Sequence, residues 1–185
     1  VGPLGQPAPL HKVEHVIGVA GGVGAAPLYP QLRKLHEMGV KVDVIIGGRS
    51  TEFVILADKF AEFCDNVYIT TDDGSLGIKG FVTTKLQELI DAGEKIDEVI
   101  TIGPLIMMKN VVALTRKYDI KTSVSLNPIM IDGTGMCGGC RVTVGGETKF
   151  ACVDGPDFDG FEVDFDECMK RQTMFKEEEH DCRIG

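Results

Sequence analysis

The chain has 185 residues, of which 43% are hydrophobic, and this length and apolar content allow a substantial core and argue against intrinsic disorder. The formal net charge of -9, with no cluster of Lys or Arg, excludes nucleic acid and anionic membrane surfaces from the expected partners. No stretch approaches the length of a membrane span and no secretory signal pattern is present, so we expect a cytoplasmic protein with reduced thiols.

The first fifteen residues are rich in turn formers. The sequence starts at Val1 and continues with two glycines and three prolines before residue 10, which is typical of the exit from a strand and not of a natural start. We therefore expect residues 1–15 to be a linker from a preceding part of a longer protein.

Residues 16–127 repeat one theme, a short β-branched run followed by a segment with helical periodicity. The predicted strands are nearly continuously apolar, as parallel strands covered on both faces are, and lie at 16–20, 42–46, 66–70, 98–102 and 122–126. The predicted helices are 28–38, 51–63, 82–92 and 106–118, with Gly39 and Gly93 placed as C-caps. This alternation predicts an α/β fold with a doubly wound, five-stranded parallel sheet.

A glycine-rich turn directly follows the first predicted strand and opens the first predicted helix. Glycines in such a turn let the backbone approach a pyrophosphate, whose charge is met by free amide hydrogens and the helix dipole. The spacing is not the usual Gly-x-Gly-x-x-Gly, and packing alone can also require glycine here. The candidate nucleotide-binding residues are Gly21, Gly22, Val23, Gly24, Ala25, Ala26 and Pro27.

Three later turns lie at the same predicted sheet edge, where open α/β sheets bind ligands. Arg49 and Ser50 follow the second strand, in the place of the acidic residue that would bind a ribose, so spacing alone leaves NAD and NADP open. Asp72 and Asp73 follow the third strand and are either ligand contacts or a helix cap. Gly103 and Pro104 follow the fourth strand, where glycine leaves room for a planar ring.

The pattern changes in residues 128–185, which we expect to form a small cysteine-rich lobe ending in a helix. Residues 141–150 alternate with period two around Gly145 and Gly146, which predicts a tight hairpin. Residues 164–179 are highly charged and predict a solvated helix that packs one stripe, made of Phe165, Cys168, Met169, Gln172 and Phe175.

Three of the six cysteines gather within this lobe. Cys137 and Cys140 lie in a glycine-rich turn, Cys152 follows the hairpin, and Asp132 lies five positions before Cys137, where a first ligand would be expected. We expect these four residues to hold a 2Fe-2S cluster. A zinc site and a redox-active dithiol are the alternatives that this spacing leaves open. We assign no role to Cys64, Cys168 or Cys182.

Together these motifs resemble the ferredoxin-NADP reductase superfamily. They are the glycine-rich turn at 21–27, the Thr-Asp-Asp-Gly-Ser loop at 71–75, Gly103-Pro104 with Met107-Met108, and the lobe from Asp132 to Cys152. The nearest resemblance is to the small subunit of Nfn-type NADH-dependent ferredoxin:NADP oxidoreductases and sulfide dehydrogenases. Those subunits carry an aspartate where the related dihydroorotate dehydrogenase electron-transfer subunits have a first cysteine, and Asp132 occupies that place.

The resemblance implies that three segments of the chain have different roles. Residues 1–15 would be the remnant of a missing FAD-binding β-barrel, residues 16–127 a ferredoxin-reductase NAD(P)H-binding domain, and residues 128–185 the 2Fe-2S lobe. NADH, in preference to NADPH, would give hydride to the FAD, and electrons would pass through the cluster to a larger flavin and iron-sulfur subunit. Because cofactors carry this chemistry, no side chain is expected to be catalytic.

Two rival interpretations stay open. The chain could belong to a dihydroorotate dehydrogenase electron-transfer subunit, or it could be a zinc-stabilised module that senses NAD(H) without turnover.

Overall fold

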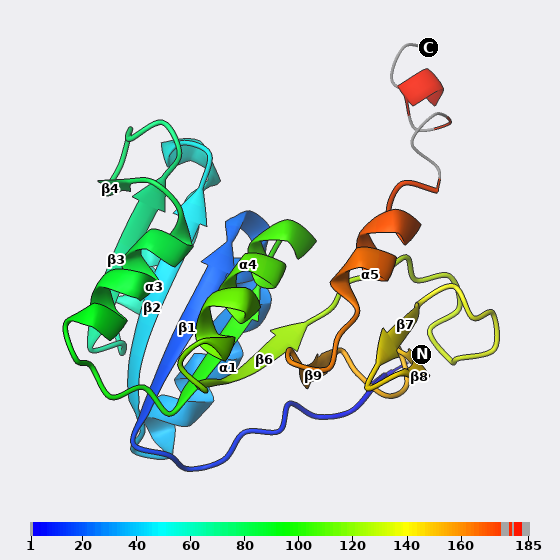
Figure 1. Cartoon of the computed structure of the whole chain (residues 1–185), viewed down its shortest axis with the longest axis horizontal. Coiled ribbons are helices and arrows are strands. Elements are labelled where there is room, and N and C mark those ends of the chain that lie inside the picture. The colour runs from blue at the N-terminus through cyan, green and yellow to red at the C-terminus, as the bar shows by residue number, and fades with distance from the viewer. Residues whose placement is uncertain (1, 175–177, 179, 183–185) are drawn as a thin grey trace.

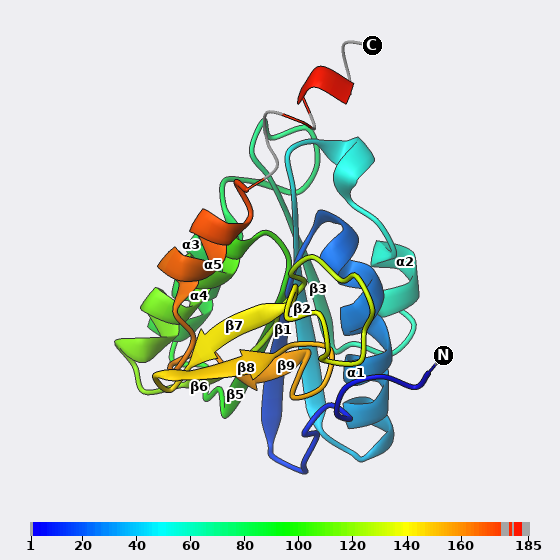
Figure 2. The same ribbon diagram turned by 90° about the vertical axis from the view of Figure 1, so that its right-hand side faces the viewer.

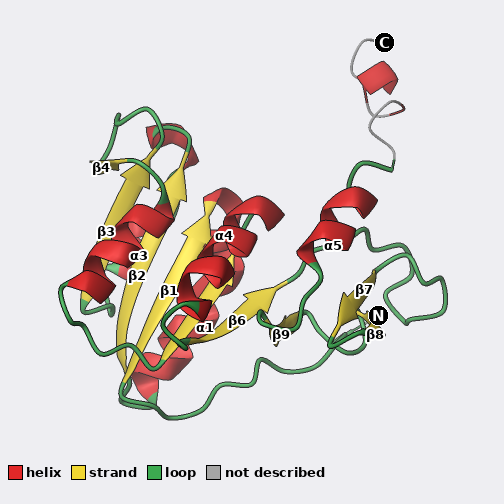
Figure 3. Ribbon diagram, in the orientation of Figure 1, coloured by secondary structure: helices red, strands yellow, loops and turns green. Residues whose placement is uncertain are grey.

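The β-branched runs form the central strands of a parallel sheet in the computed structural model, which describes residues 2–174, 178 and 180–182 (Figures 1 and 3). Five strands pair in parallel and correspond to the five predicted ones. They are β1 (His15–Gly21), β2 (Lys41–Gly48), β3 (Asn66–Thr71), β5 (Glu98–Ile102) and β6 (Lys121–Ser125). The predicted α/β class with a mostly parallel sheet is confirmed.

The sheet is wider than predicted because a short strand is added at each edge. Its order is β4-β3-β2-β1-β5-β6-β9. At one edge β4 (Ile78–Lys79) pairs in parallel with β3, and at the other β9 (Asp157–Asp159) pairs antiparallel with β6. The prediction of five strands was wrong in this respect, because strands of two and three residues with polar side chains carry no readable periodicity.

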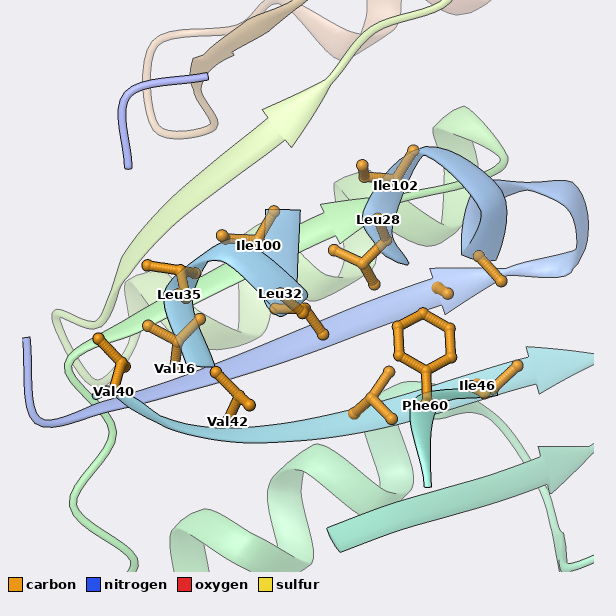
Figure 4. Packing of buried hydrophobic residues seen from close by; sticks show 13 residues of the cluster. Val16, Leu28, Leu32, Leu35, Val40, Val42, Ile46, Phe60, Ile100 and Ile102 are labelled. Carbon is orange, nitrogen blue, oxygen red and sulfur yellow. The ribbon is translucent and has the colours of Figure 1, made fainter. Parts of the chain in front are cut away.

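Helices cover both faces of the sheet, as Figure 2 shows in a view along its edge. One face packs against α1 (Ala25–Glu37) and α2 (Ala57–Phe60), and the other against α3 (Val82–Asp91) and α4 (Leu105–Arg116). Leu28, Leu32 and Phe60 lie fully buried over the central strands (Figure 4). In the described part of the chain, none of the helices has the length and apolar character needed to cross a membrane.

The predicted helix at 51–63 is a second correction. The segment forms a 3-10 turn, η2 (Thr51–Phe53), then continues through Val54 in extended conformation, and only the four residues of α2 are α-helical. Leu56 adopts a left-handed conformation with φ of 61°. A left-handed residue cannot continue a right-handed helix, so the segment is broken although its apolar spacing is helical.

The lobe forms the predicted hairpin and a shorter helix than predicted. Strands β7 (Arg141–Val144) and β8 (Glu147–Phe150) meet at Gly145 and Gly146, both with positive φ. The helix α5 (Phe165–Arg171) starts at Asp164, whose Oδ1 accepts the Glu167 N–H at 2.9 Å. It ends eight residues before the predicted limit, and the predicted stripe residue Phe175 lies outside the described residues.

This lobe packs against α4 and against β6 of the main sheet through buried hydrophobic residues. Met108 of α4 and Val124 of β6 share one buried cluster with Val142 of β7 and Phe165 of α5. The N-terminal segment crosses below the sheet to the same lobe, where the Gln6 N–H donates to the Gly155 carbonyl oxygen at 2.7 Å (Figure 1). The expected domain boundaries at residues 15 and 127 remain a prediction.

A buried ion pair joins the first two strands at their amino-terminal ends. His15 and Asp43 are 4% and 2% exposed, and His15 Nε2 lies 2.9 Å from Asp43 Oδ2. His15 Nδ1 lies 2.9 Å from the Lys95 carbonyl oxygen, and Asn66 Nδ2 donates to Asp43 Oδ1 at 2.9 Å. Because a carbonyl and an ionised carboxylate can only accept, both ring nitrogens of His15 carry a proton.

The surroundings shift both pKa values in the direction that keeps the pair charged. Burial lowers the pKa of His15, but hydrogen bonds to Asp43 and the Lys95 carbonyl outweigh it and leave that pKa raised. Burial likewise raises the pKa of Asp43, but hydrogen bonds from His15 and Asn66 leave it lowered. The pair therefore stabilises the fold most between the ordinary pKa values of aspartate and histidine, 3.8 and 6.5, and its contribution is lost as the pH falls through the lowered pKa of Asp43 or rises through the raised pKa of His15.

We predict that His15→Phe destabilises the protein by about 3 kcal/mol near pH 6, because the buried carboxylate of Asp43 then keeps only the longer ion pair with Lys41, whose Nζ lies 3.9 Å from Asp43 Oδ2. The difference in free energy of unfolding between wild type and His15→Phe should fall as the pH rises above about 6.5 and through the raised pKa of His15, because the imidazolium is then lost. Urea unfolding between pH 6 and 9 measures both effects. His36→Phe, at an exposed position of α1, serves as the control, and equal pH slopes for wild type and His15→Phe would contradict the prediction.

Candidate functional site

The order of the strands reverses beside β1. From β1 the chain proceeds outward through β2 and β3, and then returns to place β5 on the other side of β1. In open α/β sheets, ligands bind outside the carboxyl ends of the strands at such a switch point. The turns at 21–27 and 103–104 leave β1 and β5 at this edge, so the structure brings these two predicted groups together.

The two turns approach so closely that three of their glycines cannot be replaced without a clash. A Cβ on Gly21 would lie 2.7 Å from Pro104 Cδ. A Cβ on Gly24 would lie 2.1 Å from the Ile102 carbonyl oxygen, and one on Gly103 would lie 2.9 Å from the Gly21 nitrogen. Gly22 differs because a Cβ there would have open space, although its φ of +53° favours glycine. Packing therefore explains Gly24 and Gly103, whereas Gly22 keeps free space beside an accessible backbone.

The N-terminus of α1 is open to a ligand of negative charge. The turn η1 (Gly22–Gly24) leads into it, and within the described residues no side chain caps the helix and no acidic residue lies in its first turn. Val23 is 79% exposed, and Ala26 and Pro27 are exposed beside it. Backbone amides at such a helix start attract phosphate groups, although Pro27 has no N–H to offer.

Hydrogen bonds join the loops after β2 and β3 into one polar edge. The Asp72 N–H donates to the Gly48 carbonyl oxygen at 3.1 Å, and the Asp73 N–H to the Arg49 carbonyl oxygen at 3.3 Å. Arg49 and both aspartates are exposed, while Ser50 is half-buried. The Ser75 backbone N–H is the main cause of a lowered pKa of Asp73. The structure thus places these predicted ligand contacts beside one another on the surface.

Asp132 organises the loop that precedes the first two cysteines of the lobe. Its Oδ1 accepts the Thr134 N–H and its Oδ2 accepts the Cys137 N–H, each at 2.7 Å. Hydrogen bonding by these amides, with Thr134 the larger cause, lowers the pKa of Asp132. An ionised carboxylate is therefore held next to Cys137, as a metal ligand would need to be.

Two of the three cysteines lie in direct contact in the interior of the lobe. Cys140 Sγ and Cys152 Sγ are 3.2 Å apart and buried, and this hydrogen bond is the main cause of a raised pKa of Cys152. Cys137 is exposed, and its Sγ accepts the Gly139 N–H at 3.3 Å. Amide donors to sulfur of this kind are typical around iron-sulfur clusters.

The structure does not gather all four expected ligands round one point. Over residues 2–174, 178 and 180–182, no group of three or more His, Cys, Asp or Glu side chains is arranged to hold a metal ion. The donor chemistry nevertheless fits an iron-sulfur cluster, since it offers three thiols, an ionised carboxylate and a loop with positive φ at Gly133, Gly135 and Gly138. The ligand set stays a prediction.

Of the remaining cysteines, Cys64 packs against the core of the sheet, whereas Cys168 of α5 lines the same cavity as Cys137. Burial raises the pKa of Cys64 to about 12 and that of Cys168 to about 11, so both remain protonated and unreactive. Cys182 is exposed. That Cys64 and Cys168 have no role in the site stays a prediction.

Two arginines near the cysteines were not expected from the sequence. Arg171 of α5 donates from Nη2 to the Gly139 carbonyl oxygen at 3.1 Å, and Arg141 donates from Nη1 to the Gly138 carbonyl oxygen at 3.4 Å. Both line a cavity of about 220 Å³ together with Cys137 and with Leu105 from the start of α4. Arg171 and Gly139 are 32 positions apart, so the sequence carries no local signal for this contact.

Comparison with known proteins identifies the lobe. Residues 127–164, which include all four expected ligands, match the family model of the iron-sulfur cluster binding domain of dihydroorotate dehydrogenase B. This match favours iron-sulfur over zinc and over a dithiol among the interpretations that spacing left open.

Longer relatives match nearly the entire chain. It is 55% identical to an uncharacterised protein in the adh 3′ region of Clostridium beijerinckii and 48% identical to a homologue of the dihydroorotate dehydrogenase B (NAD(+)) electron transfer subunit from Thermotoga maritima. Each comparison covers 97% of this chain and 63% of the relative. The chain thus spans less than two thirds of the length of these relatives.

A solved structure shares the fold. A chain in the structure of the NADH-dependent reduced ferredoxin-NADP oxidoreductase, studied for flavin-based electron bifurcation, superposes with a TM-score of 0.89 at 47% identity, over 97% of this chain and 64% of that chain. The chain is therefore similar to dihydroorotate dehydrogenase B electron-transfer subunits over most of its length, has a ferredoxin-reductase-like fold, and contains a region that matches an iron-sulfur cluster binding domain.

Proposed function

We propose that this chain is the nucleotide- and cluster-binding part of an electron-transfer oxidoreductase subunit. The observation that carries the proposal is the position of Leu105, which lies two residues after Gly103 at the nucleotide edge and lines the same cavity as Cys137. The start of α4 therefore lies at the expected nucleotide edge and also lines the cavity beside the cysteine loop. This proximity is what electron passage between a pyridine nucleotide, a flavin and a cluster requires.

At the nucleotide edge, we assign diphosphate binding to the backbone of Gly22 to Ala26. The open turn at Gly22 and the uncapped start of α1 supply amide hydrogens and a positive dipole end. Gly103 lets the turn after β5 pack directly against Gly21 and Met107, and we assign the nicotinamide ring to the sheet edge beside these two turns. Arg49, Ser50, Asp72 and Asp73 form the polar rim for the adenosine half, and NAD(H) is the proposed nucleotide in preference to NADP(H).

In the lobe, we assign cluster binding to Asp132, Cys137, Cys140 and Cys152. When bound, a 2Fe-2S cluster supplies one-electron transfer and the nicotinamide and flavin supply hydride chemistry. The protein's part is to hold the donors: amide hydrogen bonds keep Asp132 ionised, and burial of Cys140 and Cys152 excludes water from their sulfur atoms. The Gly139 N–H is aimed at Cys137 Sγ.

The finer assignment is to the Nfn type. It is supported by Asp132 in the place of a first cysteine and by the 47% identity to the NADH-dependent reduced ferredoxin-NADP oxidoreductase. In the longer protein, FAD would be held by the additional barrel domain, and a larger flavin and iron-sulfur subunit would receive the electrons. The second candidate is an electron-transfer subunit of dihydroorotate dehydrogenase, which the family model and the name of the Thermotoga maritima relative favour.

We predict that anaerobically reconstituted protein is brown and contains iron and acid-labile sulfide in equal amounts, as a 2Fe-2S centre requires. Single replacement by Ala of Cys137, Cys140 or Cys152 should abolish most of the bound iron, and Asp132→Ala should make it labile. Iron and sulfide analysis with visible absorption measures this. Cys64→Ala, at a half-buried thiol outside the lobe, is the control. Colourless, iron-free wild-type protein, or Asp132→Ala with unchanged iron content and stability, would contradict the assignment.

Asp132→Cys separates the two candidate subunits. An oxygen ligand is harder than a thiolate, so in the Nfn type the replacement should change both cluster stability and coupling to the partner. Visible absorption during exposure to chelator, with electron transfer in the full complex, measures the two properties. A variant that behaves like wild type in both would favour the dihydroorotate dehydrogenase type.

We predict that Gly24→Ala weakens NADH binding about tenfold, or about 1.4 kcal/mol, because the new Cβ pushes the turn away from β5. The same clash should destabilise the fold by about 1 to 3 kcal/mol. Calorimetric titration with NADH and chemical unfolding measure the two effects. Val23→Ala in the same turn is the control and should change stability by less than about 0.5 kcal/mol. Equal NADH affinity in wild type and Gly24→Ala would place the nucleotide elsewhere.

A further inference from the structure

Arg171 links the last turn of α5 to the turn between Cys137 and Cys140. Its Nη2 donates to the Gly139 carbonyl oxygen at 3.1 Å, and its side chain is half-buried. A guanidinium on a carbonyl oxygen fixes the direction of that peptide. With its carbonyl turned to Arg171, the peptide between Gly139 and Cys140 directs its N–H to the opposite side.

The neighbouring peptide is oriented in the same sense by a second arginine. The Gly138 carbonyl oxygen accepts from Arg141 Nη1 at 3.4 Å, while the N–H of the same peptide, on Gly139, donates to Cys137 Sγ at 3.3 Å. Hydrogen bonds in series polarise one another, so a cation on the carbonyl strengthens the N–H as a donor to sulfur. The guanidinium of Arg141 thereby favours negative charge on Cys137 Sγ through the polarised peptide.

Neither guanidinium is neutralised by a partner within the described residues. The ion pairs of that part of the chain involve other cations, and none joins Arg141 or Arg171 to a carboxylate. Both arginines instead line the cavity of about 220 Å³ that also contains Cys137. Their charge therefore faces the loop of the expected cluster.

The position of Arg171 is held by the anchoring of α5. Asp164 caps the helix, Cys168 is buried against the lobe, and Lys109 of α4 pairs with Asp166 at 2.7 Å. These contacts lie within one to two turns of Arg171. The guanidinium is thus presented from a fixed helix that also packs on α4, whose first residue lies at the nucleotide edge.

We propose that Arg171 is a positioning residue for the cluster that also raises its reduction potential, with Arg141 assisting it. The inference rests on the proposed function. Reduction adds one electron and therefore one negative charge to the cluster, and a nearby fixed cation favours that state. The contact with Gly139 also holds the turn that carries Cys137 and Cys140 in the shape from which its amides reach sulfur.

The test compares Arg171→Ala, Arg171→Gln and Arg171→Lys in the reconstituted full chain. The readouts are the midpoint potential, followed by electron paramagnetic resonance of the reduced cluster, and the rate of iron loss to a chelator. We expect the Ala and Gln variants to have a more negative potential than wild type, and Arg171→Lys, which keeps the charge, to remain close to wild type. Arg171→Ala and Arg171→Lys should both lose iron faster, because neither can hold the Gly139 carbonyl as the planar guanidinium does.

Lys170→Ala is the matched control. It removes the same charge from the adjacent, exposed position of α5, which is not among the residues that line the cavity with Cys137. The inference is overturned if Lys170→Ala shifts the potential as much as Arg171→Ala, or if the Arg171 variants match wild type in potential and in iron loss. Wild-type protein without iron and sulfide would instead overturn the proposed function, so the two failures are distinguishable.

Discussion

The packing of the cysteine-rich lobe on the edge of the sheet is the constraint on which the rest of the structure depends. Strand β9 pairs with β6, and α5 packs on α4 through a shared buried cluster. Helix α4 and strand β6 both belong to the α/β part of the chain, which carries the candidate nucleotide-binding edge. Cys137 and Leu105, the residue that follows the Gly103-Pro104 turn, therefore line one cavity, although more than thirty residues separate them in the chain.

Both halves of the candidate site are built largely from backbone. At the nucleotide edge, glycines let two turns meet within van der Waals distance and leave amides at the start of α1 open. In the lobe, amides bind Asp132 and Cys137, and arginines orient the carbonyls of the same turn. Main-chain donors are fixed by the fold, so they lie ready for an anionic cofactor with little reorganisation. The charged pair of His15 and Asp43 lies at the other end of β1, where it stabilises the sheet without entering this site.

Sequence periodicity predicted the elements whose pattern is long or whose turn chemistry is specific. The five central strands and the hairpin at Gly145 and Gly146 are examples. It failed where one residue overrides the pattern: Leu56 takes a left-handed conformation and breaks a segment with helical spacing. It also missed β9, because three residues between Pro156 and Gly160 become a strand only when β6 offers them hydrogen bonds.

The sequence by itself determined the α/β class, the glycine-rich turn after the first strand, and the residue types of the cysteine loop, because these are local properties of spacing and side-chain chemistry. Tertiary structure alone decided that Gly24 must be glycine, since the carbonyl that excludes a side chain belongs to Ile102. It likewise brought Arg171 to Gly139 across 32 residues. Contacts between segments far apart in the chain depend on how strands and helices pack, and no local pattern encodes them.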